Sequence, residues 1–212
     1  MDSFYVTYVL LLTTGTITFI EALRTKVKMV QHIMNLETCI SVVAGYFYSV
    51  FHEKVKRMKE INWKEITRIR YVDWAITTPM MLLVLSLVLS FNSKTTIKLH
   101  WFALTVFFNY VMLYAGYAGE TGQLEKITAS VIGFIALFLT YGLVFLNYLL
   151  PKQNRDNTVV FSLFVVVWSM YGVVYHWDEM QKNVAYNYLD LISKCLVGIG
   201  LWIYYTKIIR AA

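Results

Sequence analysis

Long runs of apolar residues, separated by short polar segments, dominate the pattern of this chain. A helix that crosses the hydrocarbon core of a bilayer needs about 20 mostly apolar residues. Seven runs reach that length, so we expect seven transmembrane helices. The predicted spans are residues 4–23, 30–51, 66–91, 99–118, 127–149, 157–177 and 183–206.

The loops between these runs leave no room for a separate soluble domain. We therefore expect residues 1–212 to form a single domain, an all-α integral membrane protein built as a seven-helix bundle. The first run starts next to Met1 without a basic segment before it, and no small-residue cleavage site follows it. It is therefore predicted to be a retained helix and not a signal peptide.

The composition supports a membrane protein and argues against a nucleic-acid partner. Of the 212 residues, 58% are hydrophobic and 15% are charged, whereas soluble domains average about 25% charged residues. The net charge of +6 comes from lysines and arginines scattered between apolar blocks. They are divided almost evenly between the two sets of loops, so the positive-inside rule does not decide the orientation. Cys39 and Cys195 have no metal-site or disulfide spacing, and we expect no metal.

A small set of ionisable residues lies inside the apolar runs. A charge in hydrocarbon is costly, so each should face the bundle interior and have a partner. One such residue is most simply a structural ion pair or, near a helix end, a side chain that extends to the interface. Several together favour a functional site. They are Glu37, Arg70, Asp73, Asp190 and Lys194.

Two of these charges have helical spacing in the last run. Asp190 and Lys194 are four residues apart and share a helix face. A buried lysine amine can form a salt bridge or can condense with a carbonyl compound to a Schiff base, and the cationic base needs an anion nearby. In the third run, Asp73 and Thr77 have the same spacing, with Arg70 one turn earlier. Such a group could trap a proton and pass it on.

These segments resemble a known family. Arg70-Tyr71-Val72-Asp73-Trp74-Ala75-Ile76-Thr77-Thr78-Pro79 resembles the third-helix signature of microbial (type 1) rhodopsins, and Asp190-Leu191-Ile192-Ser193-Lys194 resembles their retinal attachment motif. Asn35-Leu36-Glu37-Thr38-Cys39 is most similar to the small rhodopsins of giant algal viruses. The resemblance implies all-trans retinal bound to Lys194 as a protonated Schiff base. It also implies an extracellular N-terminus, a cytoplasmic C-terminus and a homo-oligomer in the lipid bilayer.

The resemblance also implies a set of chromophore-binding residues. Tyr48 matches a tyrosine that hydrogen-bonds the seventh-helix aspartate, and an apolar Met81 favours green absorption. Without the resemblance, the aromatic stripe on the sixth helix would be taken as plain core. Gly172 stands where the family usually has proline. The residues expected to surround retinal are Trp74, Thr78, Met81, Asn109, Met112, Gly116, Trp168, Tyr171 and Tyr175.

By resemblance to proton-pumping members, Asp73 is the proton acceptor and counterion, and Asp190 is the second counterion. Arg70 acts as the gate towards the extracellular side. Thr77, one turn from Asp73, is expected to hydrogen-bond the Asp73 carboxylate.

The usual proton donor is missing, because Val84 stands where pumps have a carboxylate eleven residues after the acceptor. Val84 lies roughly 16 Å beyond Asp73 along its helix. Glu37 precedes Tyr48 by eleven residues on an antiparallel helix, so it should lie at the depth of Val84. We expect Glu37 to be the donor; the alternative is that it only hydrogen-bonds Ser41 or a neighbour.

The sequence thus predicts a light-driven outward proton pump, a transporter and not an enzyme. One alternative is a light-gated ion channel, with Glu37, Ser41 and Asn187 along a water-filled path. Another is a photosensor that signals to a membrane partner, and a protein without retinal is a remote third. A chloride pump is disfavoured by Asp73. The proton-release group is undecided among Glu120, Asp178 and Glu179.

Overall fold

The computed structural model describes residues 2–57 and 61–207, and nearly all of them are helical. Among these residues, seven helices are long and apolar enough to cross a membrane, which confirms the predicted number. They fall into two compact units, Met1–Asn62 with Asn183–Ala212, and Trp63–Lys182. The spans are Ser3–Arg24, Lys28–Arg57, Trp63–Ser93, Leu99–Glu120, Lys126–Leu149, Arg155–Val174 and Glu179–Thr206.

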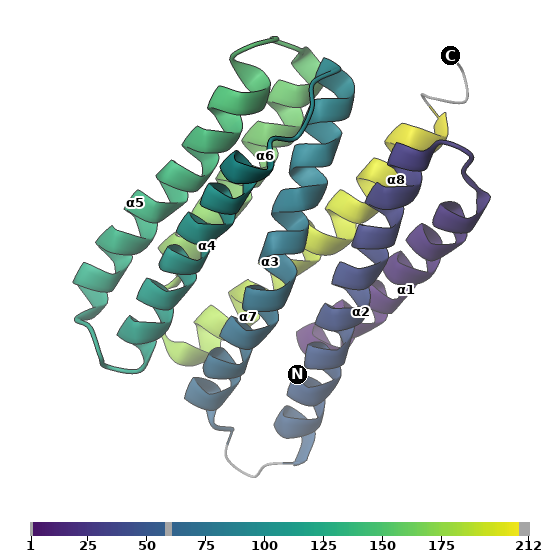
Figure 1. Cartoon of the computed structure of the whole chain (residues 1–212). Coiled ribbons are helices and arrows are strands. Elements are labelled where there is room, and N and C mark those ends of the chain that lie inside the picture. Colours follow the sequence, from purple (N-terminus) through teal and green to yellow (C-terminus); the bar gives the residue numbers. More distant parts are fainter. Residues whose placement is uncertain (1, 58–60, 208–212) are drawn as a thin grey trace. The chain divides into compact units, whose positions relative to one another are not determined.

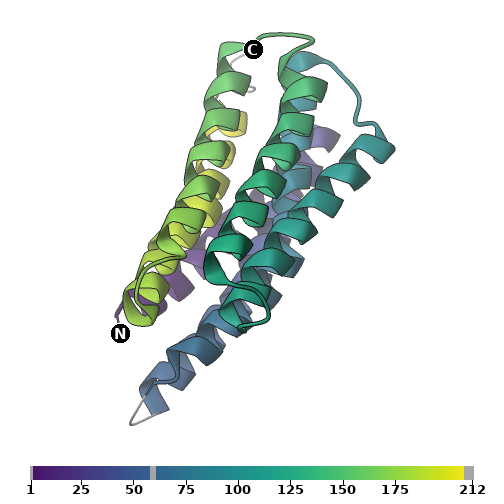
Figure 2. The same cartoon turned by 90° about the vertical axis from the view of Figure 1, so that its left-hand side faces the viewer.

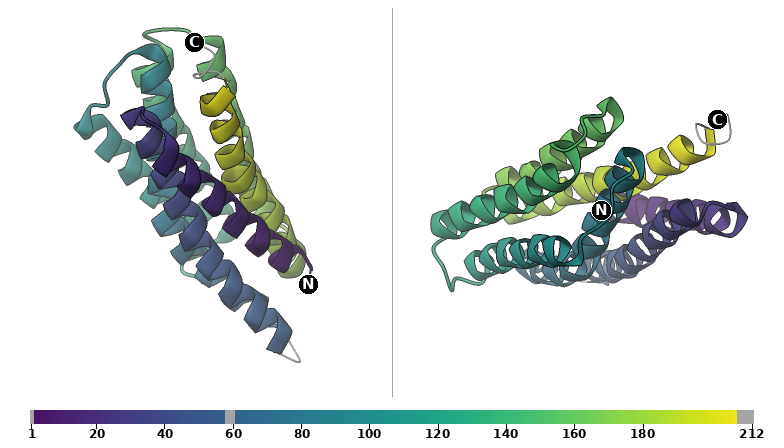
Figure 3. Two further views of the ribbon diagram at one scale, coloured as in Figure 1. Left: turned by 90° about the vertical axis from the view of Figure 1, so that its right-hand side faces the viewer. Right: turned by 45° about the horizontal axis from the view of Figure 1, so that its top comes forward.

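The first unit contains α1 (Asp2–Arg24), α2 (Lys28–Arg57), most of α7 (Glu179–Asp190), η2 (Leu191–Leu196) and α8 (Val197–Lys207). α1 and α2 form an antiparallel pair (Figure 1). A Cβ built on Gly15 would lie 3.1 Å from Cβ of Ser41, so glycine allows the two helices to pack closely there. η2 and α8 pack along α1, as the purple and yellow ribbons of Figure 3 show.

One face of α1 buries several polar side chains, whereas large apolar side chains of the same helix are exposed. Thr7, Thr14, Thr18 and Glu21 are buried, at the three- and four-residue spacings of one helix face. This is the reverse of a soluble helix and suits a lipid environment, where buried polar groups find partners in the bundle. The large exposed side chains of α1 are Tyr5, Val6, Val9, Leu12, Phe19, Ile20 and Leu23.

The second unit contains α3 (Trp63–Ser93), α4 (Leu99–Glu120), α5 (Lys126–Val144), η1 (Phe145–Leu149) and α6 (Arg155–Val174), with the first residues of α7. α4 and α5 form a hairpin, visible in green in Figure 2. In its turn, Gly122 has a φ of 76°, which favours glycine.

Pro79 lies inside α3 without ending it. Proline has no N–H, so the carbonyl of Ala75, four residues earlier, loses its helical partner. The hydroxyl of Tyr110 on α4 donates to that carbonyl oxygen at 3.1 Å. A proline in a membrane helix is tolerated when a neighbouring helix supplies such a bond.

Three features differ from the expected pattern. The second span was predicted to end at residue 51, but α2 continues to Arg57. The sixth span was predicted to reach residue 177, but α6 ends at Val174 and a turn follows, while α7 begins at Glu179, before the expected residue 183. Two segments, η1 and η2, have the wider hydrogen bonding of a π-helix. The hydrophobic pattern carries no signal for such segments, because their residues are as apolar as an α-helical span.

Candidate functional site

Lys194 and Asp190 form a buried ion pair in the first unit. Nζ of Lys194 lies 3.5 Å from Oδ1 of Asp190, and the two side chains are 1% and 0% exposed. The hydroxyl of Tyr48, from α2, donates to Oδ2 of Asp190 at 2.8 Å. The spacing of the last run and the resemblance predicted these two contacts, and the structure contains both. Burial makes the pair costly unless each charge is compensated.

The backbone around Lys194 is π-helical. In η2, the N–H of Val197 bonds to the carbonyl of Ile192, five residues earlier. Single π-helical turns inside α-helices occur frequently at functional sites. Here the segment starts directly after Asp190 and contains Lys194, so the amine lies on the part of the helix that departs from α geometry and its anion directly precedes that part.

The acceptor group predicted on α3 lies in the second unit. Arg70, Asp73 and Thr77 are all buried. The hydroxyl of Thr77 donates to the backbone carbonyl of Asp73 at 2.9 Å. The expectation that it bonds the Asp73 carboxylate is therefore wrong, because a hydroxyl has one proton to donate and the carbonyl one turn earlier is within reach.

The structure brings several of the residues expected around retinal into contact. Within the second unit, the ring of Tyr171 meets Trp74 edge-on, with centroids 5.4 Å apart. Nδ2 of Asn109 donates to the hydroxyl of Thr78 at 2.8 Å.

The other residues expected around retinal make contacts of their own. Tyr175, just past the end of α6, donates to the carbonyl of Gly116 at 3.1 Å. Trp168 packs edge-on against Tyr141, with ring centroids 5.6 Å apart. Tyr141 was not among the residues expected from the sequence. Met81 is buried and Met112 is half-buried.

Glu37 is buried inside the first unit, 2% exposed. A Cβ built on Gly198 of α8 would lie 3.0 Å from Oε2 of Glu37 and 2.9 Å from Cγ2 of Thr14, so glycine is what makes room for the carboxyl. The hydroxyl of Ser41 is buried and has no hydrogen-bond partner within the described residues. Glu37 therefore does not bond Ser41, and the other part of that alternative, a structural contact with another neighbour, stays open.

The second unit also contains a cluster of charged side chains, which the sequence analysis did not predict. Nζ of Lys182 lies 2.7 Å from Oε1 of Glu120 and 2.8 Å from Oε1 of Glu179, and its side chain is fully buried. The hydroxyl of Thr67 donates to Oε2 of Glu179 at 3.2 Å. Lys182 was expected in a loop; the i, i+3 spacing of Glu179 and Lys182 was the available signal.

The ring of Tyr175 lies beside this cluster. Nζ of Lys126 and of Lys182 lie 5.2 and 5.9 Å from its centroid. Burial, together with the carboxylates of Glu120 and Glu179, raises the pKa of the Tyr175 phenol to about 12.

Comparison with known proteins shows the family of this chain. The family model described as bacteriorhodopsin-like protein matches residues 1–208. The crystal structure of viral rhodopsin OLPVRII is 46% identical, with a TM-score of 0.92, over 98% of this chain and 97% of that chain.

Two relatives known by sequence match over a shorter stretch. The blue-light absorbing proteorhodopsin of Gamma-proteobacterium Hot 75m4 is 26% identical over 152 residues, which are 64% of this chain and 60% of the relative. Sensory rhodopsin III of Haloarcula marismortui is 32% identical over 150 residues, also 64% and 60%. The match thus spans about three fifths of the length of these relatives.

The fold and the buried lysine define a multi-pass helical membrane protein with the attachment chemistry of a retinal protein. The chain belongs to the bacteriorhodopsin-like family, the microbial rhodopsins. Members of this family are light-driven transporters and photoreceptors, and they bind retinal through a Schiff base.

The residues present fit such a group. Lys194 offers a primary amine with a carboxylate beside it, which is the donor set that a cationic Schiff base requires. In the second unit, Oδ1 of Asn109 is buried and has no hydrogen-bond partner among the described residues. Trp74 and Tyr171 supply aromatic surface of the kind that suits a flat polyene.

Proposed function

We propose that this chain is a light-driven outward proton pump that carries all-trans retinal on Nζ of Lys194. The buried pair of Lys194 and Asp190 is the observation that supports the proposal most strongly. Retinal supplies the light-driven isomerisation that starts each cycle. The chain supplies the groups that hold and move the proton.

In this proposal, Asp73 is the carboxylate that takes the proton from Nζ of Lys194. That transfer neutralises both groups, and each of them then no longer carries the cost of a buried charge. Asp190 stays ionised because the Tyr48 hydroxyl bonds its charged form. The guanidinium of Arg70 directs the proton to the extracellular side. Thr77 fixes the backbone of α3 at Asp73.

Glu37 returns the proton to Nζ of Lys194 from the cytoplasmic side. Its carboxyl is buried, and burial disfavours the charged form of a carboxyl group. Glu37 therefore holds a proton at rest and can give it up. Substitution Glu37→Gln should slow the last phase of the photocycle; an unchanged rate eliminates Glu37 as the donor.

The remaining parts of the proposal concern the assembly. The whole chain acts as one retinal-binding domain in the lipid bilayer, with its N-terminus outside and its C-terminus in the cytoplasm. It forms a homo-oligomer, for which aromatic side chains on the outer helix faces provide contact area. The most exposed are Tyr46, Phe107, Tyr114, Phe138 and Tyr188.

A light-gated ion channel is the second candidate. Buried polar groups of the first unit favour it: Nδ2 of Asn187 donates to Oγ of Ser3 at 2.9 Å, and Thr7 donates to the carbonyl of Asn187 at 3.4 Å. With Ser41 and Glu37 these groups could line a water-filled path. The sensory rhodopsin among the relatives keeps a photosensor as a third candidate.

Photocurrent under voltage clamp separates the three candidates. A pump gives a current of one sign at all voltages, and illumination acidifies an unbuffered cell suspension until a protonophore abolishes the effect. A channel current reverses sign with the ion gradient. A sensor gives little current and a slow photocycle. A current that reverses would overturn the pump.

A further inference from the structure

We propose that Glu21 is the proton-uptake residue of this chain, and that the hydroxyls of Thr18 and Thr14 carry its proton to Glu37. The inference rests on the proposed donor role of Glu37 and extends it to the residues that refill the donor. All of them belong to the first unit.

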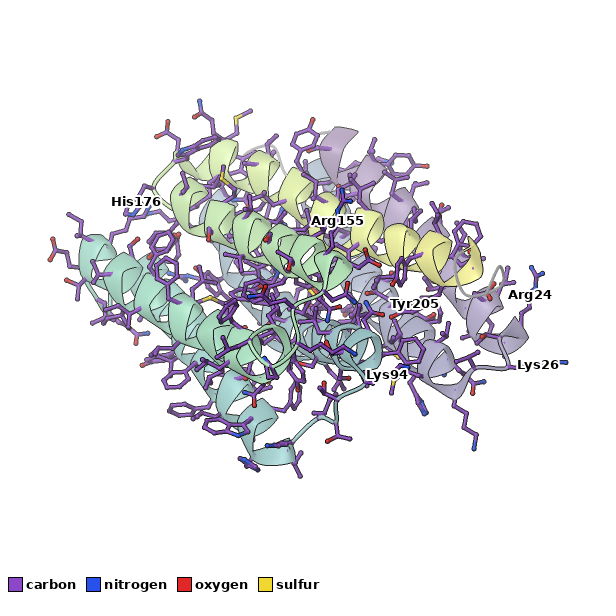
Figure 4. The ribbon with its side chains drawn as sticks, turned by 90° about the horizontal axis from the view of Figure 1, so that it is seen from above. Arg24, Lys26, Lys94, Arg155, His176 and Tyr205 are labelled. Carbon is purple, nitrogen blue, oxygen red and sulfur yellow. The ribbon has the colours of Figure 1, made fainter. Side chains whose placement is uncertain are left out.

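Glu21 is a buried carboxyl close to the end of a membrane helix. It is 4% exposed and lies three residues before the end of α1 at Arg24. Arg24 and Lys26, by contrast, are exposed and extend away from the ribbon (Figure 4). A charged side chain near a helix end normally extends to the interface, because that costs less than burial. Glu21 does not, which indicates a role inside.

A row of threonine hydroxyls along α1, called the file below, extends from the membrane depth of Glu21 to that of Glu37. Thr14, Thr18 and Glu21 follow one buried face of α1, one turn apart. The hydroxyl oxygens of Thr18 and Thr38 lie 2.9 Å apart, which ties this face to the residue next to Glu37.

The file ends at the donor. Thr14 and Glu37 meet at Gly198, where Cγ2 of Thr14 and Oε2 of Glu37 lie 2.9 and 3.0 Å from the same Cβ position. Thr14 is buried, and its hydroxyl lies beside the thiol of Cys195, which is only a weak hydrogen-bond partner. A hydroxyl in that state can accept a proton from one side and give its own to the other.

The distances show why a file is needed. Glu37 lies nine residues inside α2 from its start at Lys28, which is about 14 Å of helix. Glu21 and Thr14 are seven residues apart, about 10 Å along α1. Because a polar group lies at each turn of α1, the proton can cross this distance in several short transfers. Apolar side chains alone would offer no group that binds the proton on the way.

The transfer conserves protons. When Glu37 has given up its proton, a threonine hydroxyl donates to its carboxylate and takes a proton from the Glu21 carboxyl. Glu21, now ionised, takes a proton from water at the α1–α2 loop. One proton enters for each proton that Glu37 releases, and every hydroxyl returns to its starting state.

The first test compares variants by flash photolysis of the protein reconstituted with retinal. Glu21→Gln should slow the last phase of the photocycle about tenfold or more, Thr18→Val should also slow it, and Glu21→Asp should restore most of the rate. The double substitution of Glu21 and Glu37 by glutamine should be no slower than Glu37→Gln alone. Glu53→Gln, on the exposed surface of α2, is the matched control and should change nothing.

The second test needs no light. In D2O, the infrared carbonyl band of the Glu37 carboxyl shifts as its proton exchanges, and Glu37→Gln identifies the band. Glu21→Gln should lengthen the exchange half-time about tenfold, with Glu53→Gln unchanged. If Glu37→Gln slows the photocycle but Glu21→Gln matches the wild-type protein in both tests, the uptake role of Glu21 is wrong and the donor role of Glu37 is kept. If the last phase of the photocycle is not slowed in Glu37→Gln, the donor role of Glu37 and the uptake role of Glu21 are both wrong.

Discussion

The hydroxyl of Tyr48 donates a 2.8 Å hydrogen bond to Asp190 across 142 residues of sequence, and it fixes the carboxylate that faces Lys194. The bond joins α2 to the end of α7 and is fully buried. It holds the negative charge next to the amine in one orientation, so the anion is in place before any cation forms on Nζ.

Substitution Tyr48→Phe should lower the free energy of unfolding by about 1.5–3 kcal/mol, because the substitution removes a hydrogen bond to a buried charge. The measurement is thermal loss of the visible absorption band. Tyr46→Phe is the matched control, since Tyr46 lies on the same helix and is 65% exposed. Equal stability of both variants would contradict the role given to the bond.

The Lys182 cluster should be a large contributor to stability. Lys182→Met leaves two carboxylates without their cation and should cost about 3–5 kcal/mol. Adding Glu120→Gln and Glu179→Gln should recover most of this loss. The exposed pair of Arg57 and Glu53 provides the contrast, since a surface ion pair contributes at most about 1 kcal/mol. Chemical denaturation in detergent measures all these variants.

The same cluster predicts an unusual alkaline titration. The pKa of Tyr175 is raised to about 12, so the folded protein favours the neutral phenol. Its contribution to stability is complete below the ordinary pKa of 10.0 and is lost as the pH rises from there to about 12. The difference in tyrosinate absorption between wild type and Tyr175→Phe should stay near zero up to pH about 11. Ionisation near pH 10 would contradict the effect of burial and of the two carboxylates.

The environment of Gly172 on α6 explains why a small residue stands there. A Cβ at this position would lie 2.5 Å from Cζ of Phe134, so Gly172→Ala should destabilise the protein by about 1–3 kcal/mol through overpacking. Phe134→Leu should relieve part of the loss. Gly142→Ala is the control, because nothing lies within 4 Å of its Cβ position and helix propensity favours alanine.

The parts of the structure that follow from helical spacing and hydrophobicity could be predicted. The seven spans and the contact between Asp190 and Lys194 follow from run length and from the four-residue spacing. The burial of Glu37 follows as well, because a single carboxyl within an apolar run must turn inward.

What depends on local competition for hydrogen bonds could not be predicted. The hydroxyl of Thr77 donates to the backbone carbonyl of Asp73, although helical spacing alone also allows a bond to the side chain of Asp73. Lys182 looked like a loop lysine because the start of α7 is polar, and its burial depends on Glu120 from another helix. The π-helical turn at Lys194 depends on backbone bonding that residue types do not specify.

The most direct measurement of the central claim is absorption spectroscopy of the apoprotein after addition of all-trans retinal, compared with Lys194→Arg. Arginine keeps the charge beside Asp190 but cannot form the Schiff base, so a folded variant without colour isolates the covalent bond. We predict a visible band for the wild-type protein and none for Lys194→Arg. A visible band of equal strength in Lys194→Arg would contradict the account.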